Sequence, residues 1–392
     1  MDFDLAEEER RFAEELERFL EESRSPEVMD ANPEQLSQTV DTPAKRAFMR
    51  KLAARGWLGL SWPKEYGGSA RSGIYDFLLC EALSRYGAPQ PGKGLGIVGK
   101  TIIRHGSEKL KREFLPRIVR GEIEFAIGYS EPQAGSDAAA MRLRATREGG
   151  GWRLNGQKTW TTSAHFADWY WVGARTDPDA PKHAGITLFL VCMDQPGLTI
   201  RPVHTIGDER TNDVFFEDVW VDDDHVVGEV NRGWTYICEA LDLERFTMMP
   251  IGPLEMKLEA LRGWVTRETR DGRPLREDSS VRRTLARLAT KLEVARMLQR
   301  RVICEALADR LPTVEASMYK LFMTELGKEL ADRALDLMGL AGVLKPGTDG
   351  APLDGRFERS YRYTVVDTIG GGTSEVQKNI IARRGLGLPR CF

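Results

Sequence analysis

The sequence lacks the features that mark a disulfide scaffold, a membrane protein or a nucleic-acid binder. Its 392 residues include five widely spaced cysteines and no C-x-x-C pair, so we expect neither a disulfide framework nor a structural zinc. No apolar run approaches the roughly 20 residues that span a bilayer. The 56 basic and 59 acidic residues nearly cancel, which gives no electrostatic reason to expect nucleic acid. We therefore expect no membrane and no nucleic-acid partner.

Signals for export, metal binding and hydrolysis are also missing. Residues 1–9 are acidic and lack a signal-peptide layout, and unpaired cysteines fit a reducing compartment, so we expect a cytoplasmic protein. The five histidines form no metal-ligand spacing, and no metal site is expected. No G-x-S-x-G elbow is present. Residues 94–99 match G-x-G-x-x-G, but a loop precedes them where dinucleotide binding requires a strand. We interpret them as a flexible entry to a helix, with a Rossmann site as the weaker alternative.

What is present divides the chain into three regions. Residues 1 to about 122 are predicted to be helical, beginning with an amphipathic stripe at Phe12, Leu16, Phe19 and Leu20. Residues 123 to 229 have the alternation and turn residues of a β domain. Residues 230 to 392 return to long helical patterns. We predict an α+β multidomain protein with an N-terminal helical domain (1–122), a middle antiparallel β domain (123–229) and a C-terminal helical bundle (230–392).

Individual elements can be predicted inside these regions. Strands are expected at 170–174, 186–191 and 213–221, and Asn155-Gly156 predicts a two-residue hairpin turn. Helices are expected at 233–269, 280–309 and 313–338, with a last helix starting near Ser374 after a glycine-rich turn.

Two segments of the middle region offer residue types that suit a planar cofactor with polar edges. Residues 127–137 (IGYSEPQAGSD) contain two serines around a sequence that can turn tightly. Residues 156–162 (GQKTWTT) add an indole ring and hydroxyl groups. Taken singly, serine, aspartate and glycine favour turns whatever the function, and a tryptophan in a strand is usually a core residue.

Residues 130–137 resemble the T/S-E-P-x-A-G-S-D signature of the acyl-CoA dehydrogenase family, and residues 160–163 resemble its W-I-T-N-type segment. The helical–β–helical order is also similar to the fold of that family. The resemblance implies an FAD cofactor, with Ser130 at the flavin ring edge, Trp160 beside the ring and Thr162 at its polar edge. It implies that Ser136 contacts FAD and the acyl-CoA. The further implied FAD contacts are Ile127, Tyr129, Gly135, Thr373 and Glu375.

The resemblance also predicts the position of the catalytic base. Two positions of the sequence differ from most members of the family, one by lacking a carboxylate and one by having it. Most members carry a glutamate in a Y-E-G-T-S loop, whereas here residues 368–375 read TIGGGTSE with Gly371 at that position. Glu244 matches the position of the base in the isovaleryl and long-chain branches. We therefore predict Glu244 as the base. Asp242 and Arg245 are predicted to bind the substrate, Arg245 through its CoA part, and Gly371 and Gly372 to approach the thioester oxygen. The competing interpretation of residues 241–245 is a solvated helix face.

The implied reaction is the oxidation of an acyl-CoA to the trans-2-enoyl-CoA. A carboxylate removes the α-proton while the flavin N5 accepts the β-hydride. An electron-transfer flavoprotein is the implied acceptor. Small residues near Gly371 could admit a branched or steroid side-chain acyl group. The alternatives are a non-catalytic subunit, and a flavin oxidase or monooxygenase of the same fold.

A second part of the family's FAD site departs from the pattern. In homotetrameric relatives a neighbouring subunit contributes an R-x-x-F-G-x-P-type and a Q-x-x-G-G-x-G segment. Here Asp271 replaces the phenylalanine, Asp336 the glutamine and Leu340 the second glycine. Added negative charge and bulk oppose binding of a phosphate-rich cofactor there. We hypothesise that a homologous partner chain supplies this half in an α2β2 heterotetramer, as in bacterial steroid side-chain enzymes. A homotetramer or homodimer is the alternative.

Overall fold

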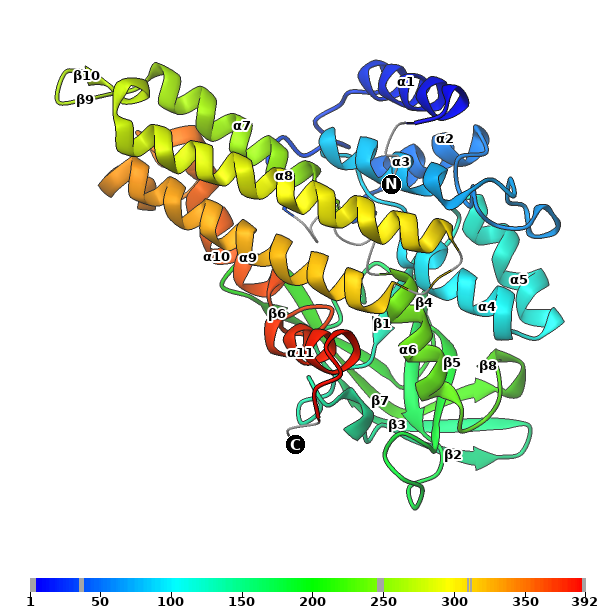
Figure 1. The fold of residues 1–392 in the computed structure, drawn as a ribbon. Coiled ribbons are helices and arrows are strands. Elements are labelled where there is room, and N and C mark those ends of the chain that lie inside the picture. Colours follow the sequence, from blue (N-terminus) through cyan, green and yellow to red (C-terminus); the bar gives the residue numbers. More distant parts are fainter. Residues whose placement is uncertain (1–4, 35–38, 245–249, 309, 311, 390–392) are drawn as a thin grey trace.

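The computed structural model describes residues 5–34, 39–244, 250–308, 310 and 312–389, without the side chains of 242–244. A helical region, a β region and a second helical region follow one another along the chain (Figure 1). This order confirms the predicted fold class. Within the described part, no helix is long and apolar enough to cross a membrane.

The N-terminal region contains α1 (Glu7–Glu22), α2 (Pro43–Ala54), α3 (Gly73–Arg85), α4 (Gly99–His105) and α5 (Glu108–Val119). The predicted stripe of α1 is buried, with each of its four residues at most 6% exposed. The G-x-G-x-x-G segment forms a π-helical turn, Gly94–Val98, that leads into α4. Because no strand precedes this turn, the structure contains no Rossmann motif at this place, as predicted.

The middle region is an eight-stranded sheet with the order β6-β7-β3-β2-β4-β5-β8, and β1 pairs in parallel with β4. The strands β4 (Trp169–Arg175), β5 (Ile186–Cys192) and β7 (Arg210–Asp222) confirm the three predicted strands. The other five were not predicted: β1 (Phe125–Gly128), β2 (Arg144–Glu148), β3 (Gly151–Lys158), β6 (Leu198–His204) and β8 (Val226–Val227). Buried aliphatic and aromatic side chains fill the inner faces of the sheet.

The predicted hairpin at Asn155-Gly156 is wrong. β3 continues through both residues, and the turn lies at residues 149–150, between β2 and β3. Asn155 instead marks a bulge against β7: its side-chain amide donates to Asp218 Oδ1 at 2.9 Å, and the Asp218 amide donates to Asn155 Oδ1 at 3.0 Å. Gly156 has a φ of 141°, which glycine adopts without strain. The Asn-Gly pair therefore forms part of a β-bulge here.

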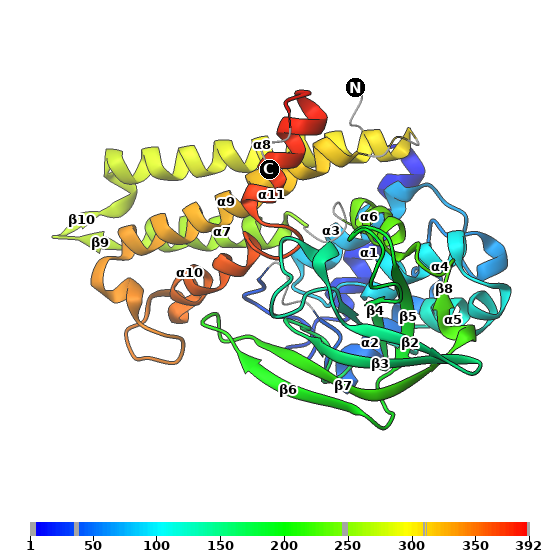
Figure 2. The same ribbon diagram turned by 90° about the horizontal axis from the view of Figure 1, so that it is seen from below.

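The C-terminal region contains α6 (Gly233–Glu244), α7 (Gly252–Arg267), α8 (Ser279–Leu307), α9 (Thr313–Met338), α10 (Arg356–Asp367) and α11 (Ser374–Ile380). The prediction of one helix over 233–269 is wrong, because α6 and α7 are separate elements with Pro250 between them. Proline disfavours helical backbone in the residue before it. The helices α7, α8 and α9 extend beyond the sheet, and the hairpin β9 (Thr269–Arg270) and β10 (Arg273–Pro274) stands at their far end (Figures 1 and 2).

Candidate flavin and acyl-CoA site

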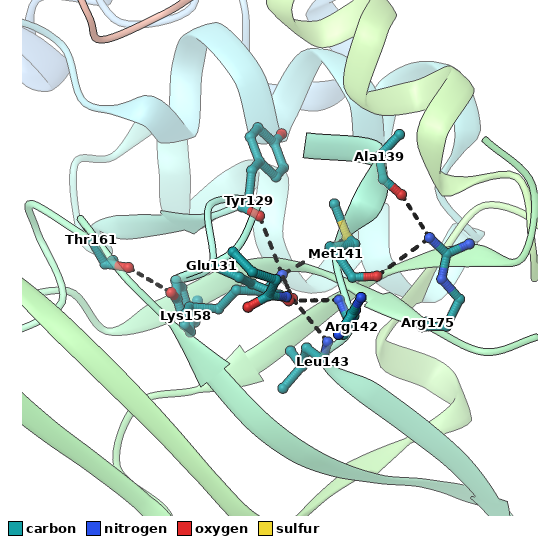
Figure 3. A network of polar contacts seen from close by, with 11 residues as sticks. Tyr129, Glu131, Ala139, Met141, Arg142, Leu143, Lys158, Thr161 and Arg175 are labelled. Carbon is teal, nitrogen blue, oxygen red and sulfur yellow. Dashed lines mark hydrogen bonds and ion pairs between the residues drawn. The ribbon is translucent and has the colours of Figure 1, made fainter. Parts of the chain in front are cut away.

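The residues 130–137 segment follows β1 and turns back tightly. The Glu131 and Ala134 backbones exchange two hydrogen bonds of 3.0 Å, which closes the turn. Arg175 donates to the carbonyl oxygens of Ala139 (2.7 Å) and Met141 (3.3 Å) and so holds the chain that leaves the turn. Figure 3 shows the Arg175 contacts with Ala139 and Met141, next to a separate group of contacts around Glu131. These hydrogen bonds hold the loop in one conformation.

A buried ion pair stands beneath this loop. Lys158 Nζ lies 2.7 Å from Glu131 Oε1, and both side chains are at most 2% exposed (Figure 3). The amides of Arg142 (2.6 Å) and Leu143 (2.9 Å) also donate to the Glu131 carboxylate. Burial raises the pKa of Glu131, but Lys158 and these amides outweigh it and hold the pKa below its usual value. Glu131 therefore stays charged and fixes the loop to β3.

Trp160 is the most unusual residue of the predicted site. Its φ is 58°, in the left-handed region that bulky residues avoid, and its side chain is 61% exposed. The neighbours hold this conformation in place: the Thr159 amide donates to Ser130 O at 3.0 Å, and the Thr161 amide donates to Asn212 O at 2.9 Å. A strained, exposed indole persists only where its surroundings impose it, and such residues cluster at ligand sites.

The hydroxyls next to Trp160 strengthen the same anchoring. Thr159 Oγ lies 2.5 Å from Asp213 Oδ1, and Thr161 Oγ lies 2.7 Å from the buried Tyr170 hydroxyl. Thr159 also ties this segment to Ser130 through its backbone amide. The structure thus brings together the two segments that the sequence singled out.

The remaining predicted residues of these segments differ in exposure. Ile127, Tyr129, Ser130 and Thr162 are half-buried, whereas Gly135 and Ser136 are exposed. The Tyr129 hydroxyl accepts a hydrogen bond of 2.7 Å from Trp171 Nε1, so its ring is fixed from the inside. At Gly135 an added Cβ would meet no atom within 4 Å, which leaves open space above the loop.

The glycine-rich turn before α11 is fixed through its carbonyl groups. The buried Lys320 donates to Gly372 O at 2.8 Å, and Gln377 donates to Gly371 O at 3.2 Å. Gly371 and Gly372 have φ values of 66° and 94°. Among the described residues, no backbone carbonyl accepts from the amides of these two glycines. The turn therefore directs its carbonyls into the protein and leaves two amides for other acceptors.

Thr373 and Glu375 lie at the start of α11. Thr373 is the N-cap, and its hydroxyl accepts from the Val376 amide at 3.2 Å. Glu375 is exposed in the first turn, where backbone and Thr373 hydrogen bonds lower the pKa of its carboxyl. The Thr373 hydroxyl thus accepts from the cap amide and donates to the Glu375 carboxylate.

The predicted base and its neighbours are at the end of α6. Glu244 is the last residue of that helix, and Asp242 belongs to the same helix. The side chains of both, and Arg245 entirely, lie outside the described residues. Their roles stay predictions.

The segments that depart from the family pattern lie together at the opposite end of the molecule. Arg270 Nη2 donates to Leu337 O at 2.5 Å and joins the β9–β10 hairpin to the end of α9 (Figures 1 and 2). Leu340 is 92% exposed, and Asp336 forms an exposed 2.8 Å ion pair with Arg333. Asp271 has a φ of 51° in the hairpin turn.

Sequence reasoning missed the residues that brace the site from below. Lys158 and Glu131 stand within the recognised segments but were not assigned a role, and Lys320 was not considered. Their signal is weak in one sequence, because a charge among hydroxyl and glycine residues is typical of a solvated loop. Only the fold reveals that these charges are buried.

Known proteins resemble this chain over its whole length. Models of the acyl-CoA dehydrogenase N-terminal, middle and C-terminal domains match residues 6–122, 126–219 and 231–386. Acyl-CoA dehydrogenase FadE26 of Mycobacterium tuberculosis is 37% identical over 353 residues, 88% of each chain.

Two solved structures resemble the fold with 34% identity, each covering 100% of both chains. One is the Tcur3481-Tcur3483 steroid ACAD, with a TM-score of 0.88. The other is the ChsE4-ChsE5 complex from Mycobacterium tuberculosis, with a TM-score of 0.89. The chain belongs to the acyl-CoA dehydrogenase family of FAD-dependent flavoprotein oxidoreductases.

Proposed function

We propose that this chain binds FAD and oxidises an acyl-CoA thioester to the trans-2-enoyl-CoA, with Glu244 as the base. The observation that carries the proposal is the exposed, strained Trp160, held beside Ser130 by the Thr159 amide. Family membership and the two heteromeric structural relatives support it. The likeness to the Tcur3481-Tcur3483 steroid ACAD also favours a bulky acyl group of the steroid side-chain type.

The described residues fit the flavin. Trp160 offers an exposed aromatic face, and Ser130 and Thr162 lie beside it with hydroxyl groups. Gly135 leaves room for close approach of a ligand to the backbone. Ile127, Tyr129, Ser136, Thr373 and Glu375 would contribute further contacts to the cofactor, and Ser136 would also contact the substrate. Bound FAD would supply the ring that accepts the β-hydride.

The protein's own residues would manage the proton and the thioester. Glu244 takes the α-proton, Arg245 binds the CoA part, and Asp242 also binds the substrate. The free amides of Gly371 and Gly372 donate to the thioester oxygen and favour the charge that develops there. Lys320 and Gln377 hold those amides in place through the carbonyl groups of the same turn. Gly371 itself offers no carboxylate, so the base must come from another position.

The second half of the FAD site is proposed to come from a homologous partner chain. The segments with Asp271, Asp336 and Leu340 lie far from the sheet, so they can meet a flavin only on another subunit. Asp336 and the bulk of exposed Leu340 oppose FAD at that surface. An α2β2 heterotetramer pairs the intact half with the partner's corresponding segments. An electron-transfer flavoprotein is the proposed acceptor, and the cytoplasm the proposed compartment.

Glu244→Gln tests the assignment of the base. We expect turnover to fall by about 10²–10⁴-fold, while bound FAD stays the same. The matched control is Glu259→Gln, an exposed glutamate of α7 that pairs with Arg262 at 2.8 Å. Activity is measured in the complex with the partner chain, by bleaching of flavin absorbance. Unchanged turnover in Glu244→Gln would refute Glu244 as the base. Oxygen consumption without an added acceptor would favour the oxidase or monooxygenase alternative.

A further inference from the structure

A buried lysine lies behind the glycine-rich turn that precedes α11. Lys320 belongs to α9 and is 2% exposed, and its Nζ donates to Gly372 O at 2.8 Å. Burial raises the pKa of the nearby Asp367 carboxyl to about 8, although Lys257 and Lys320 oppose this shift. Asp367 is therefore mainly protonated at neutral pH and does not cancel the charge of Lys320. A charge in a buried region acts through a lower effective dielectric than a solvated charge.

The conformation of the turn has supports besides Lys320. Gln377 Nε2 also donates to Gly372 O, at 3.1 Å. The Ser374 amide donates to Thr368 O at 3.0 Å and closes the turn. Gly372 O would therefore keep one donor if the ammonium group of Lys320 were removed. What Lys320 adds to these hydrogen bonds is a positive charge.

The peptide groups of the turn connect this charge to the opposite side of the backbone. In a trans peptide the C=O and the N–H point in opposite directions, so a carbonyl that is held by buried donors turns the next amide away from them. Gly371 O and Gly372 O are held in this way, which directs the Gly372 and Thr373 amides outward. A donor at the carbonyl also polarises the peptide and strengthens its N–H as a donor. A Cβ added at Gly371 would meet no atom within 4 Å, so the turn adjoins open space.

We infer that Lys320 is a positioning residue whose charge acts through the glycine-rich turn and stabilises the negative charge that develops on the thioester oxygen. The inference rests on the proposed acyl-CoA dehydrogenase function. In that reaction the α-carbon gives its proton to Glu244, and the electron pair of the broken C–H bond is shared with the thioester oxygen, as in an enolate. Donors and positive charge that face this oxygen favour the enolate over the neutral thioester. A lysine that only supported the fold would not change this balance.

A 3-oxoacyl-CoA, with the acyl chain of a thioester that the wild type oxidises, separates proton removal from oxidation. Its α-proton is acidic, and its β-carbon has no hydrogen, so it can form the enolate but cannot give up a hydride. Ultraviolet difference absorbance measures the bound enolate in the flavin-loaded complex with the partner chain at neutral pH. We expect Lys320→Met to lower the ratio of enolate to neutral ligand by about 10-fold or more. Lys320→Gln, which also removes the charge but keeps a hydrogen-bond donor, should lower it similarly.

Two further variants separate the charge from the hydrogen bonds of the turn. Gln377→Met removes two hydrogen bonds but no charge, so it should lower the enolate ratio less than Lys320→Met does. Lys51→Met removes the same charge from an exposed lysine of α2 and should leave the ratio unchanged. Melting temperature and FAD content establish that each variant is folded.

An enolate ratio that is unchanged in both Lys320 variants would overturn the inference, and so would a larger loss in Gln377→Met. A shift in the midpoint potential of the ligand-free flavin with no change in the enolate ratio would also overturn it, because the charge would then act on the cofactor. Oxidation of a saturated acyl-CoA by the wild type tests the proposed function separately. Such oxidation together with unchanged enolate ratios would refute the role of Lys320 alone.

Discussion

The two ends of this molecule treat charge and strain in opposite ways. Beneath the Ser130–Trp160 segments, the charged pair Glu131–Lys158 is fully buried and braces a strained, exposed indole. At the far end of α9, the pair Arg333–Asp336 is exposed, and Leu340 faces solvent. The first end has the buried support that a ligand site needs. At the second end, the contacts of the helix terminus are exposed. This difference is what we expect if the chain carries one intact half and one modified half of the proposed FAD site.

The largest expected difference in stability is between variants of the two ion pairs. Glu131→Ala leaves a buried lysine without its partner, and we expect the free energy of unfolding to fall by about 3–5 kcal/mol. Asp336→Ala removes an exposed pair and should change it by about 0–1 kcal/mol. Urea denaturation of both variants measures the two losses. Equal losses would contradict the view that only the first pair is structural.

The stability of the protein is expected to depend on pH through a buried carboxyl group near the glycine-rich turn. Asp367, at the end of α10, is 1% exposed, and burial raises the pKa of its carboxyl to about 8. The folded protein then retains a proton that the unfolded chain releases above about pH 4. Stability should therefore fall as the pH rises from about 4 to 8. Asp367→Asn should reduce this slope and gain about 1–3 kcal/mol at pH 8, where the wild type must bury a charge.

Thermal unfolding at a series of pH values checks the Asp367 prediction. The wild type serves as the internal control at pH 4, where its carboxyl is neutral and the two proteins should melt alike. Parallel profiles across the whole range would show that Asp367 is not the group responsible.

A smaller difference concerns backbone strain at the two ends. Trp160→Gly should stabilise the flavin-free protein by about 1–2 kcal/mol, since glycine tolerates positive φ and the indole buries little. The same change should weaken FAD binding. Asp271→Gly, at a similar φ, should also stabilise slightly and should not weaken FAD binding. Flavin titration measures the FAD affinity of the two variants. Equal FAD affinities would show that Trp160 does not contribute to the FAD site.

The smallest expected effect is at the turn that lacks the family's glutamate. Gly371→Ala meets no atom within 4 Å, but its φ of 66° strains any side chain, so we expect a loss of about 1 kcal/mol. Gly135→Ala, equally open but without a positive φ, should cost close to nothing. Denaturation midpoints measure both. A larger loss of stability in Gly135→Ala than in Gly371→Ala would contradict the view that the strain lies at Gly371.

Much of the architecture could be predicted because it depends on local patterns. The apolar stripe of α1, the three strands rich in β-branched and aromatic residues, and the bounds of α9 follow from periodicity. The predicted boundaries at 122/123 and 229/230 stay predictions. Elements whose identity depends on tertiary context were missed, such as α10 and the bulge at Asn155, where a hairpin motif pairs with Asp218 across the sheet instead.

The motif segments of the candidate site could be predicted from the sequence, whereas the buried residues that support them could not. Ser130 and Trp160 were found through their signatures. Lys158 and Lys320 were not, since a sequence does not tell whether a charge is buried or solvated. Both side chains are buried in the folded protein.

The FAD content of the chain purified alone tests the central claim most directly. If this chain carries one intact half of the site, the isolated protein should hold well below one FAD per chain and should gain FAD when a homologous partner chain is added. Trp160→Gly should abolish that gain, whereas the double variant Asp336→Gln with Leu340→Gly should raise FAD binding by the chain alone. One FAD per chain in a pure homo-oligomer would contradict the account.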